Sequence, residues 1–243
     1  MNNLQLSQSR LKKTSWIKLI LHFPSFFSYR IPDYSSQYAL GLPLPSPSVL
    51  KLATVATAIR VTGKVSEGKK VFNIIKNADI KIRPPSRILI NSFLIKRLKG
   101  KKDEKGLQRT FGTREYILFS DDIEVFIGGD NLENLKDYFL MMKHLGSSDS
   151  LVYTRSIDVE KPPKDAIEPL DIEKFEEFHE EDSPCLIFPV KDIKEDVKFE
   201  EINPFKRYNK KIFEQKYYFI PAKIVVGKGW KILKFRISPR WGD

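Results

Sequence analysis

Residues 97–119 read RLKGKKDEKGLQRTFGTREYILF, and the stretch changes character halfway. Its first part is rich in lysine and is punctuated by Gly100, Gly106 and Gly112, whereas it ends on the strand-like TREYILF. The segment just before it, SRILINSFLIK (86–96), is apolar and β-branched enough to predict another strand. A basic arm therefore separates two strands, and its place in the order of elements decides the fold.

Upstream of the arm, the sequence predicts a strand and a helix. WIKLILHF (16–23) alternates with the period of a strand and gathers four apolar residues on one face: Ile17, Leu19, Leu21 and Phe23. A helix is predicted from about 47 to 62, because Ser46 can cap it, Pro47 suits a first turn and Gly63 can terminate it. The predicted apolar face of this helix is Val49, Leu52, Ala53, Ala56 and Ile59. KVFNIIKNA (70–78) indicates a second, short helix.

Downstream of the arm, TREYILFSDDIEVFIGG (113–129) predicts a strand pair or one bent strand. Asp130 can then cap a helix with one apolar stripe, made of Leu132, Leu135, Tyr138, Phe139, Met142 and Leu145. SLVYTRSID (150–158) supplies a further strand.

The order over residues 15–158 is thus strand, helix, strand, strand, helix, strand, which predicts an α+β, ferredoxin-like (RRM-like) domain. Residues 1–14 are an N-terminal extension. Residues 159–243 combine an acidic, Pro-rich linker with strand-like segments and predict a smaller β-rich C-terminal region. The basic arm, at about 97–113, is inserted between the second and third strands.

Charge is segregated along the chain. The formal net charge is +11 and the sequence pI is about 9.5. Residues 81–114 hold eleven basic against two acidic side chains, whereas residues 158–201 hold six basic against sixteen acidic ones. A surplus of this kind favours a nucleic acid or an anionic membrane as partner, with mere solubility as the alternative.

Several function classes lack their motifs. Cys185 is the single cysteine, which favours a reducing compartment and excludes zinc sites built from cysteine clusters. The first residues do not form a signal peptide, and no apolar run approaches the roughly 20 residues of a membrane span. We therefore expect a cytoplasmic protein with no membrane contact. No phosphate-binding loop, paired-His metal motif or nucleophile elbow is present, so we expect no cofactor and no metal.

The arm has the composition that single-stranded RNA requires, with cations for phosphates and flat side chains for bases. Arg109 and Arg114 flank an aromatic residue and are favoured as specific contacts, because arginine can stack and bind phosphate bidentately. GKKDEKG is equally typical of a solvated loop, and Phe111 could be a core residue. The predicted RNA-binding set is Arg83, Arg87, Lys96, Arg97, Lys99, Lys101, Lys102, Lys105, Arg109, Phe111 and Arg114.

A catalytic alternative rests on histidine. A metal-independent ribonuclease uses a general base or acid, usually histidine, beside a cation. Of His22, His144 and His179, we favour His22, which ends the first strand close to Tyr29. His144 would end the second amphipathic helix, and His179 lies within a run of carboxylates. The alternative site is therefore His22 with Tyr29 or a nearby lysine.

The chain resembles the RAMP superfamily of CRISPR-associated proteins, and specifically CRISPR-associated protein family five. The resemblance is carried by FPSFFSYR (23–30) followed by LPLPSPSVL, by the basic insertion between the second and third strands, and by TREYILFSDDIEVFIGGD (113–130). It spans most of residues 15–158, and the lysine-rich character is most like the archaeal type I-A branch. One departure is that the glycine-rich loop usual in this superfamily is reduced to HLGSSDS (144–150) or VVGKGWK (225–231).

The resemblance implies a noncatalytic subunit of a type I Cascade complex that caps the 5′ handle of CRISPR RNA. The basic arm would be the thumb hairpin of that family. Its implied partners are the handle, the family-seven backbone subunit, the family-eight large subunit and, in addition, a small subunit. The catalytic alternative corresponds to relatives that process repeat RNA; these imply a histidine beside a lysine in the central segment, and residues 81–114 contain no histidine.

Overall fold

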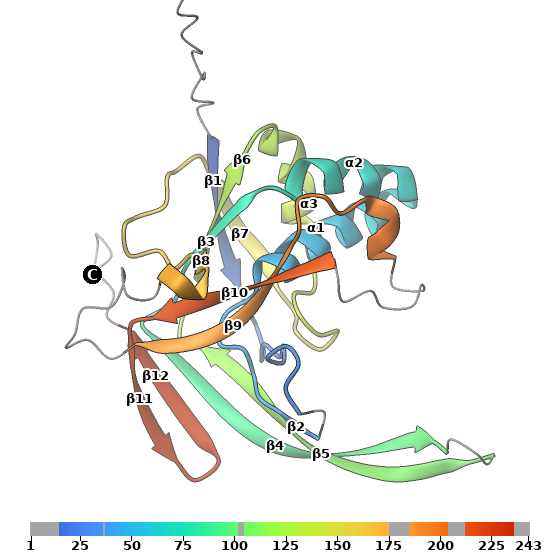
Figure 1. Cartoon of the computed structure of the whole chain (residues 1–243), viewed down its shortest axis with the longest axis vertical. Helices are drawn as coiled ribbons and strands as arrows, with labels where there is room; N and C mark the ends of the chain where they lie inside the picture. The colour runs from blue at the N-terminus through green and yellow to red at the C-terminus, as the bar shows by residue number, and fades with distance from the viewer. Residues whose placement is uncertain (1–14, 36, 102–104, 175–184, 204–211, 236–243) are drawn as a thin grey trace, which may run out of the picture.

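The computed structural model describes residues 15–35, 37–101, 105–174, 185–203 and 212–235 of a mixed α/β protein (Figure 1). Its centre is a four-stranded sheet with the order β3-β6-β1-β7, in which all neighbouring strands are antiparallel. The strands are β1 (Ser15–His22), β3 (Asp79–Arg83), β6 (Ile123–Gly129) and β7 (Tyr153–Asp158). The prediction for β1 is confirmed, since Ile17, Leu19, Leu21 and Phe23 are all buried.

The helices lie together on one side of this sheet (Figure 1). They are α1 (Pro47–Thr62), α2 (Val65–Ile75) and the short α3 (Lys136–Leu140), which follows the 3-10 turn η1 (Leu132–Leu135). α1 has the predicted bounds, and Gly63 ends it in the left-handed conformation, with φ 67°. The Ser46 side chain does not cap the helix, however; its hydroxyl lies 3.1 Å from that of Ser48.

The predicted inner face of α1 is only partly right: Val49, Leu52, Ala53 and Ile59 pack against the core, but they are not its most buried positions. Leu50, Lys51, Thr54, Val55, Thr57 and Ala58 are buried, whereas Ala56 is exposed and the other predicted positions are half-buried. The reason is a second layer over the helix: Tyr218 and Ile220 of the C-terminal region are buried in the same core as Leu50 and Val55. A helix covered on two sides buries polar residues as well, and the Thr54 hydroxyl donates to the Leu50 carbonyl at 2.9 Å.

The helix predicted after Asp130 is shorter than expected. Regular helix ends at Leu140, and His144 lies beyond it in a bridge with Leu151, so that His144 does not end the helix. The predicted stripe is nevertheless largely inside: Leu132, Leu135, Phe139, Met142 and Leu145 are buried. Sequence spacing identified which side chains enter the core, but not the 3-10 turn and loops that bring them there.

A second sheet holds the basic arm. Its order is β11-β12-β4-β5-β2, and its strands are β2 (Tyr38–Ala39), β4 (Arg87–Gly100), β5 (Leu107–Phe119), β11 (Ala222–Gly227) and β12 (Trp230–Phe235). β4 and β5 form one long hairpin that extends away from the rest of the molecule (Figure 1). The prediction that 86–96 supplies the second strand of the central sheet is wrong, since that strand is β3. The inserted hairpin is correspondingly longer than residues 97–113.

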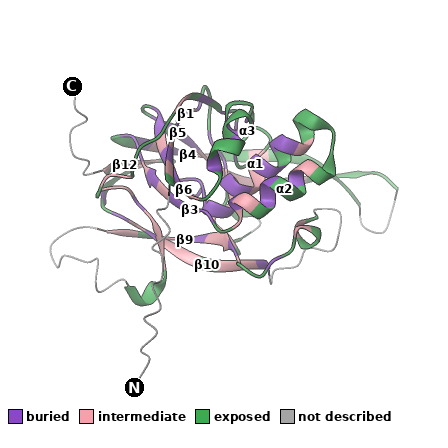
Figure 2. Cartoon of the chain, turned by 90° about the horizontal axis from the view of Figure 1, so that it is seen from above, coloured by how far each residue is buried: buried purple, intermediate pink, exposed green. Residues whose placement is uncertain are grey.

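The C-terminal region is not a separate appendage. It contains β8 (Pro169–Leu170), β9 (Leu186–Ile193) and β10 (Phe213–Ile220), joined as a sheet of order β8-β10-β9, and the 3-10 turns η2 (Ile172–Lys174) and η3 (Phe199–Ile202). β12 pairs with β4, and the Tyr218 hydroxyl donates to the Pro45 carbonyl at 2.8 Å. Figure 2 shows buried positions in the central strands, in α1 and in β9 and β10. The described residues share one hydrophobic core.

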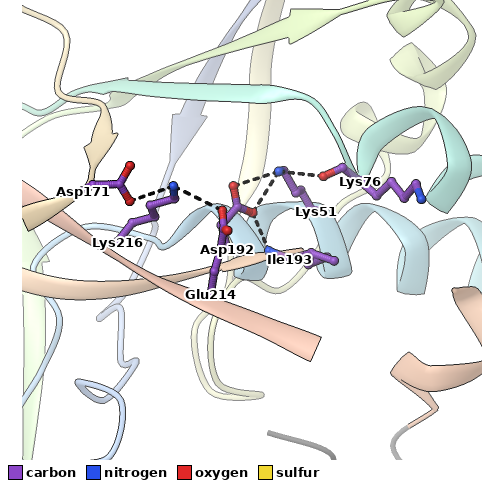
Figure 3. Close-up of polar contacts among 7 residues, drawn as sticks. All are labelled: Lys51, Lys76, Asp171, Asp192, Ile193, Glu214 and Lys216. Carbon is purple, nitrogen blue, oxygen red and sulfur yellow. Dashed lines mark hydrogen bonds and ion pairs between the residues drawn. The ribbon is translucent and has the colours of Figure 1, made fainter. Parts of the chain in front are cut away.

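A buried ion pair joins α1 to β9 (Figure 3). Lys51 is 2% exposed, and its ammonium lies 2.8 Å from an oxygen of Asp192 and donates at 2.8 Å to the Lys76 carbonyl, just beyond α2. Burial raises the pKa of the Asp192 carboxyl above its usual value, against the lowering effect of the Lys51 ammonium.

The longest helix of the described chain has 16 residues, and no helix there meets the length and apolarity of a membrane span.

Candidate nucleic-acid interface

The β4–β5 hairpin has two faces that differ in chemistry. Residues paired across an antiparallel ladder share a face, and successive residues alternate. Phe93 pairs with Arg114, whereas the next pair of the ladder joins Ser92 to Glu115. The Phe93 face therefore consists of Leu89, Asn91, Phe93, Ile95, Arg97 and Lys99 with Leu118, Tyr116, Arg114, Gly112, Thr110 and Gln108. The Glu115 face consists of the intervening pairs.

The part of the Phe93 face that lies nearest the body of the molecule is aromatic. Phe93 and Tyr116 lie with ring centroids 5.5 Å apart, and Phe26, from the loop after β1, lies 6.3 Å from Phe93 and 6.0 Å from Tyr116. All three contacts are edge-to-face. Phe26 reaches this side because its neighbour Phe27 bridges to Ile117 through two backbone hydrogen bonds of 2.8 Å and points its own ring into the core.

The outer part of the same face is basic. Arg97, Lys99 and Arg114 line a cavity of about 260 Å³ that is closed on one side by Gln37 and Ala39. Gly112 allows this closure, because a Cβ there would lie 3.1 Å from the Gln37 carbonyl oxygen. Arg114 also borders a second cavity, of about 250 Å³, with Arg30 and the Gly146–Ser147 turn. Its guanidinium is 3.9 Å from Asp149, and the side chain is partly exposed.

Near the body of the molecule, the Glu115 face makes contacts within the fold. Glu115 is 2% exposed and accepts hydrogen bonds from the Lys231 ammonium and the Gly41 amide, both at 2.8 Å. Further out the face becomes exposed: Lys96 lies 6.0 Å from the centre of the Phe111 ring, at the limit of a cation–π contact. Arg109 pairs with Leu98 on that same side.

The structure divides the predicted RNA-binding set. By strand alternation Arg97, Lys99 and Arg114 share the Phe93 face, whereas Lys96, Arg109 and Phe111 share the other. Phe111 nevertheless lines the 260 Å³ cavity together with Arg114. Phe111 is exposed, so it is not a core residue. The remaining described hairpin members are exposed: Arg87 at the base of β4, and Lys101 and Lys105 at the tip. Lys102 lies outside the described residues.

Arg83 does not belong to the hairpin. It ends β3 in the central sheet, 3.6 Å from Glu124 and 3.4 Å from Asp165, and its side chain is 12% exposed. Its charge is thus used within the fold, and we remove it from the set. Over the described hairpin residues 87–101 and 105–119, eight basic side chains remain against the single acidic Glu115, which is buried on the opposite face.

His22 belongs to a different cluster, at the end of β1. Its Nδ1 lies 2.6 Å from Asp122 Oδ1, and Arg155 Nη1 lies 3.1 Å from Asp122 Oδ2. The Tyr153 ring is tilted against the imidazole, with centroids 4.9 Å apart. Tyr29, its predicted companion, lines the cavity beside Arg114. His179 lies outside the described residues, and among those described no group of three or more His, Cys, Asp or Glu side chains could hold a metal ion.

Sequence reasoning missed the residues that come from outside the hairpin. Phe26 and Gln37 reach the Phe93 face from the segment between β1 and α1, and Asp122 and Arg155 reach His22 from β5–β6 and β7. The doubled aromatics of FPSFFSYR were a usable signal, because successive residues of an extended segment point to opposite faces. The Asp122 and Arg155 contacts depend on strand register, which the sequence does not indicate.

Comparison with known proteins gives a strong relative. No protein-family model matches the sequence. The chain is 53% identical over 226 residues to the CRISPR-associated protein Cas5 of Archaeoglobus fulgidus, covering 91% of this chain and 99% of that protein. Among solved structures it is similar to a CRISPR protein from Archaeoglobus fulgidus, with 12% identity, a TM-score of 0.47 and coverage of 91% and 92%.

A second solved structure, of a CRISPR RNA-guided surveillance complex, contains a chain with 14% identity and a TM-score of 0.46, covering 86% of this chain and 89% of that one. Both backbone likenesses are partial. Sequence identity over nearly the whole length is the finding that decides the family and confirms the resemblance. The chain belongs to the family of CRISPR-associated protein Cas5.

Proposed function

We propose that the protein is a noncatalytic RNA-binding and assembly subunit of a type I CRISPR Cascade complex, of the archaeal type I-A branch, which caps the 5′ handle of CRISPR RNA. The observation that carries the proposal is the Phe93 face, where Arg114, Arg97 and Lys99 follow an aromatic cluster along one side of a hairpin. Family membership supports the CRISPR setting.

The strand order supports a ferredoxin-like domain as the body of this subunit. The sheet order β3-β6-β1-β7, with helices after β1 and after β6, is the arrangement that a split βαβ repeat produces. The β4–β5 hairpin leaves this body between its second and third strands. The resemblance to family five implies a thumb hairpin at this position.

The chemistry on the Phe93 face suits an unpaired strand. Phosphates would contact the guanidinium and ammonium groups around the 260 Å³ cavity, and bases would lie towards the aromatic end. With about five phosphate contacts across the hairpin, log K should fall with log salt at a slope of roughly −3.5.

The docking partners that we propose are the family-seven backbone subunit, the family-eight large subunit and a small subunit. The edge strand β11 offers a surface for one of them, since Ile224, Val225 and Val226 are all exposed. An edge strand with apolar side chains readily pairs with another chain.

Sequencing the RNA that co-purifies with the native complex tests the proposal. We expect CRISPR RNAs with one shared, repeat-derived 5′ end. Heterogeneous fragments without such an end would contradict handle capping.

The face assignment has its own test in the double variant Arg97→Ala, Arg114→Ala. We expect RNA affinity to fall by roughly tenfold or more, because two charged contacts are lost. The salt slope should become less negative by about 1.4. The matched control is Lys96→Ala, Arg109→Ala, which removes two charges from the opposite face of the same hairpin. Equal losses in the two variants would reject the face assignment.

A second candidate is a metal-independent endoribonuclease that processes CRISPR repeat RNA. The His22–Asp122 contact favours it, because a carboxylate on Nδ1 orients an imidazole and leaves Nε2 for proton transfer, with the Arg155 guanidinium close by. The test is to incubate the isolated protein with labelled repeat RNA in EDTA. Site-specific cutting that disappears in His22→Ala would establish this activity, whereas intact RNA supports the noncatalytic subunit.

A further inference from the structure

Three aromatic rings from separate segments meet at the surface without being buried. Phe26 is 37% exposed and Phe93 is 44% exposed, and Tyr116 is half-buried between the strands. Exposed large apolar side chains cost hydrophobic free energy, so a contiguous group of them indicates a surface that another molecule covers. The edge-to-face contacts fix the rings relative to one another, which means that the group is preorganised.

The surroundings of the cluster indicate what covers it. Arg114 pairs directly with Phe93, and Asn91 pairs with Tyr116, so that a cation and an amide stand beside the rings on the same face. Trp230, also partly exposed, pairs with Asn91 from β12 and extends the aromatic surface. The acidic residue of the described hairpin, Glu115, is buried on the opposite face. Flat rings next to cations fit a nucleobase with its phosphate better than an apolar protein surface.

We propose that Phe26, Phe93 and Tyr116 form a stacking site for one unpaired nucleobase, with Arg114 holding the phosphate next to it. The inference rests on the proposed RNA-binding function and deepens it: the Phe93 face recognises bases as well as charge. The basic cavity around Arg97 and Lys99 then receives the neighbouring phosphates. A base in this site would be separated from its stack, which is how proteins commonly hold single-stranded RNA.

The test compares two probes with equal charge. One is an oligouridylate of eight nucleotides, and the other is the fully abasic ribose-phosphate strand of the same length. For the full-length protein we expect tighter binding of the oligouridylate by about 5- to 150-fold, the range that one stacked base supplies. In Phe93→Ala this preference should shrink several-fold, while affinity for the abasic strand and its salt slope stay unchanged.

Leu94→Ala is the matched control, because Leu94 is the next residue of β4, is 66% exposed and lies on the opposite face. It should leave both affinities unchanged. Phe93→Leu retains apolar area but no ring, and should behave as Phe93→Ala; thermal unfolding of each variant checks that the fold is intact.

The outcomes separate the two proposals. If neither strand binds, the RNA-binding function itself is rejected. If both strands bind equally tightly to the unaltered protein, or if Phe93→Ala keeps the full preference for the oligouridylate, the function stands and the stacking site is rejected. If Phe93→Ala binds both probes normally but no longer assembles with another protein subunit, the cluster is a protein-docking patch and the inference is overturned.

Discussion

Lysine serves opposite purposes in two regions of this molecule. Lys51 is 2% exposed and lies between α1 and β9, where its ammonium contacts Asp192 and the Lys76 carbonyl (Figure 3). Lys96 and Lys99 lie exposed along the β4–β5 hairpin. The buried lysine is enclosed by its partners, whereas the hairpin lysines leave their charge available to solvent or to a polyanion.

The difference teaches where charge contributes to folding and where it contributes to binding. A buried ion pair is not strong evidence of net stabilisation, because desolvation offsets most of the attraction. Its removal is costly only when one partner is left behind. An exposed cation contributes little to folding, but each one that contacts a phosphate strengthens the salt-dependent binding of a nucleic acid. Variants in the two regions should therefore differ in which measurement they change.

The largest effect is expected for Lys51→Ala. The Asp192 carboxylate and the Lys76 carbonyl would lose their buried partner, so the free energy of unfolding should fall by about 3–5 kcal/mol. Chemical denaturation measures this change. Lys69→Ala is the control: Lys69 pairs with Glu200 in an exposed contact, and its loss should not measurably change stability.

The double variant Lys51→Met, Asp192→Leu sharpens the interpretation. It removes both charges and retains apolar volume, so it should cost clearly less than Lys51→Ala. If the double variant is as unstable as the single one, the ion pair contributes net stability and the contrast drawn between the two regions fails.

A smaller effect is expected where a buried charge meets the hairpin. Glu115 accepts hydrogen bonds from Lys231 of β12 and from the Gly41 amide. Glu115→Ala leaves these donors without their acceptor and should lower the free energy of unfolding by about 1–3 kcal/mol. Denaturation compared with Thr113→Ala, two residues along the same face, gives the measurement and its control. An unchanged midpoint would show that β12 docks on β4 without this contact.

The sequence indicated the local elements well and their partners poorly. The period of residues 16–23 and the Pro47 and Gly63 signals predicted β1 and α1 because these are properties of a single segment. The buried face of α1 was only partly predicted, since Lys51 contacts Asp192 of β9, in a C-terminal layer that joins the fold only in three dimensions. No local pattern distinguishes a buried lysine from an exposed one.

The candidate site shows the same limit. Composition identified the basic arm and its aromatic residues, but it could not indicate strand alternation, which places Arg109 and Arg114 on opposite faces of β5. Arg83 was included because it lies close in sequence, whereas β3 belongs to another sheet. Phe26 enters the site only through the bridge between Phe27 and Ile117.

The smallest expected effect compares two lysines of the same strand. Lys99 lines the cavity on the Phe93 face, and Lys96 lies on the Glu115 face beside Phe111. Lys99→Ala should make the slope of log K against log salt less negative by about 0.7, the contribution of one phosphate contact on a single strand. Lys96→Ala should leave the slope unchanged, because its side chain points away from the proposed RNA.

Neither substitution should alter the denaturation midpoint, since both side chains are exposed. Affinity for an oligouridylate of eight nucleotides, titrated at several salt concentrations, supplies both slopes in one experiment. Equal changes for the two lysines would mean that RNA follows the hairpin without choosing a face. A change for Lys99 alone would mean that strand alternation, and not net charge, decides which lysines bind.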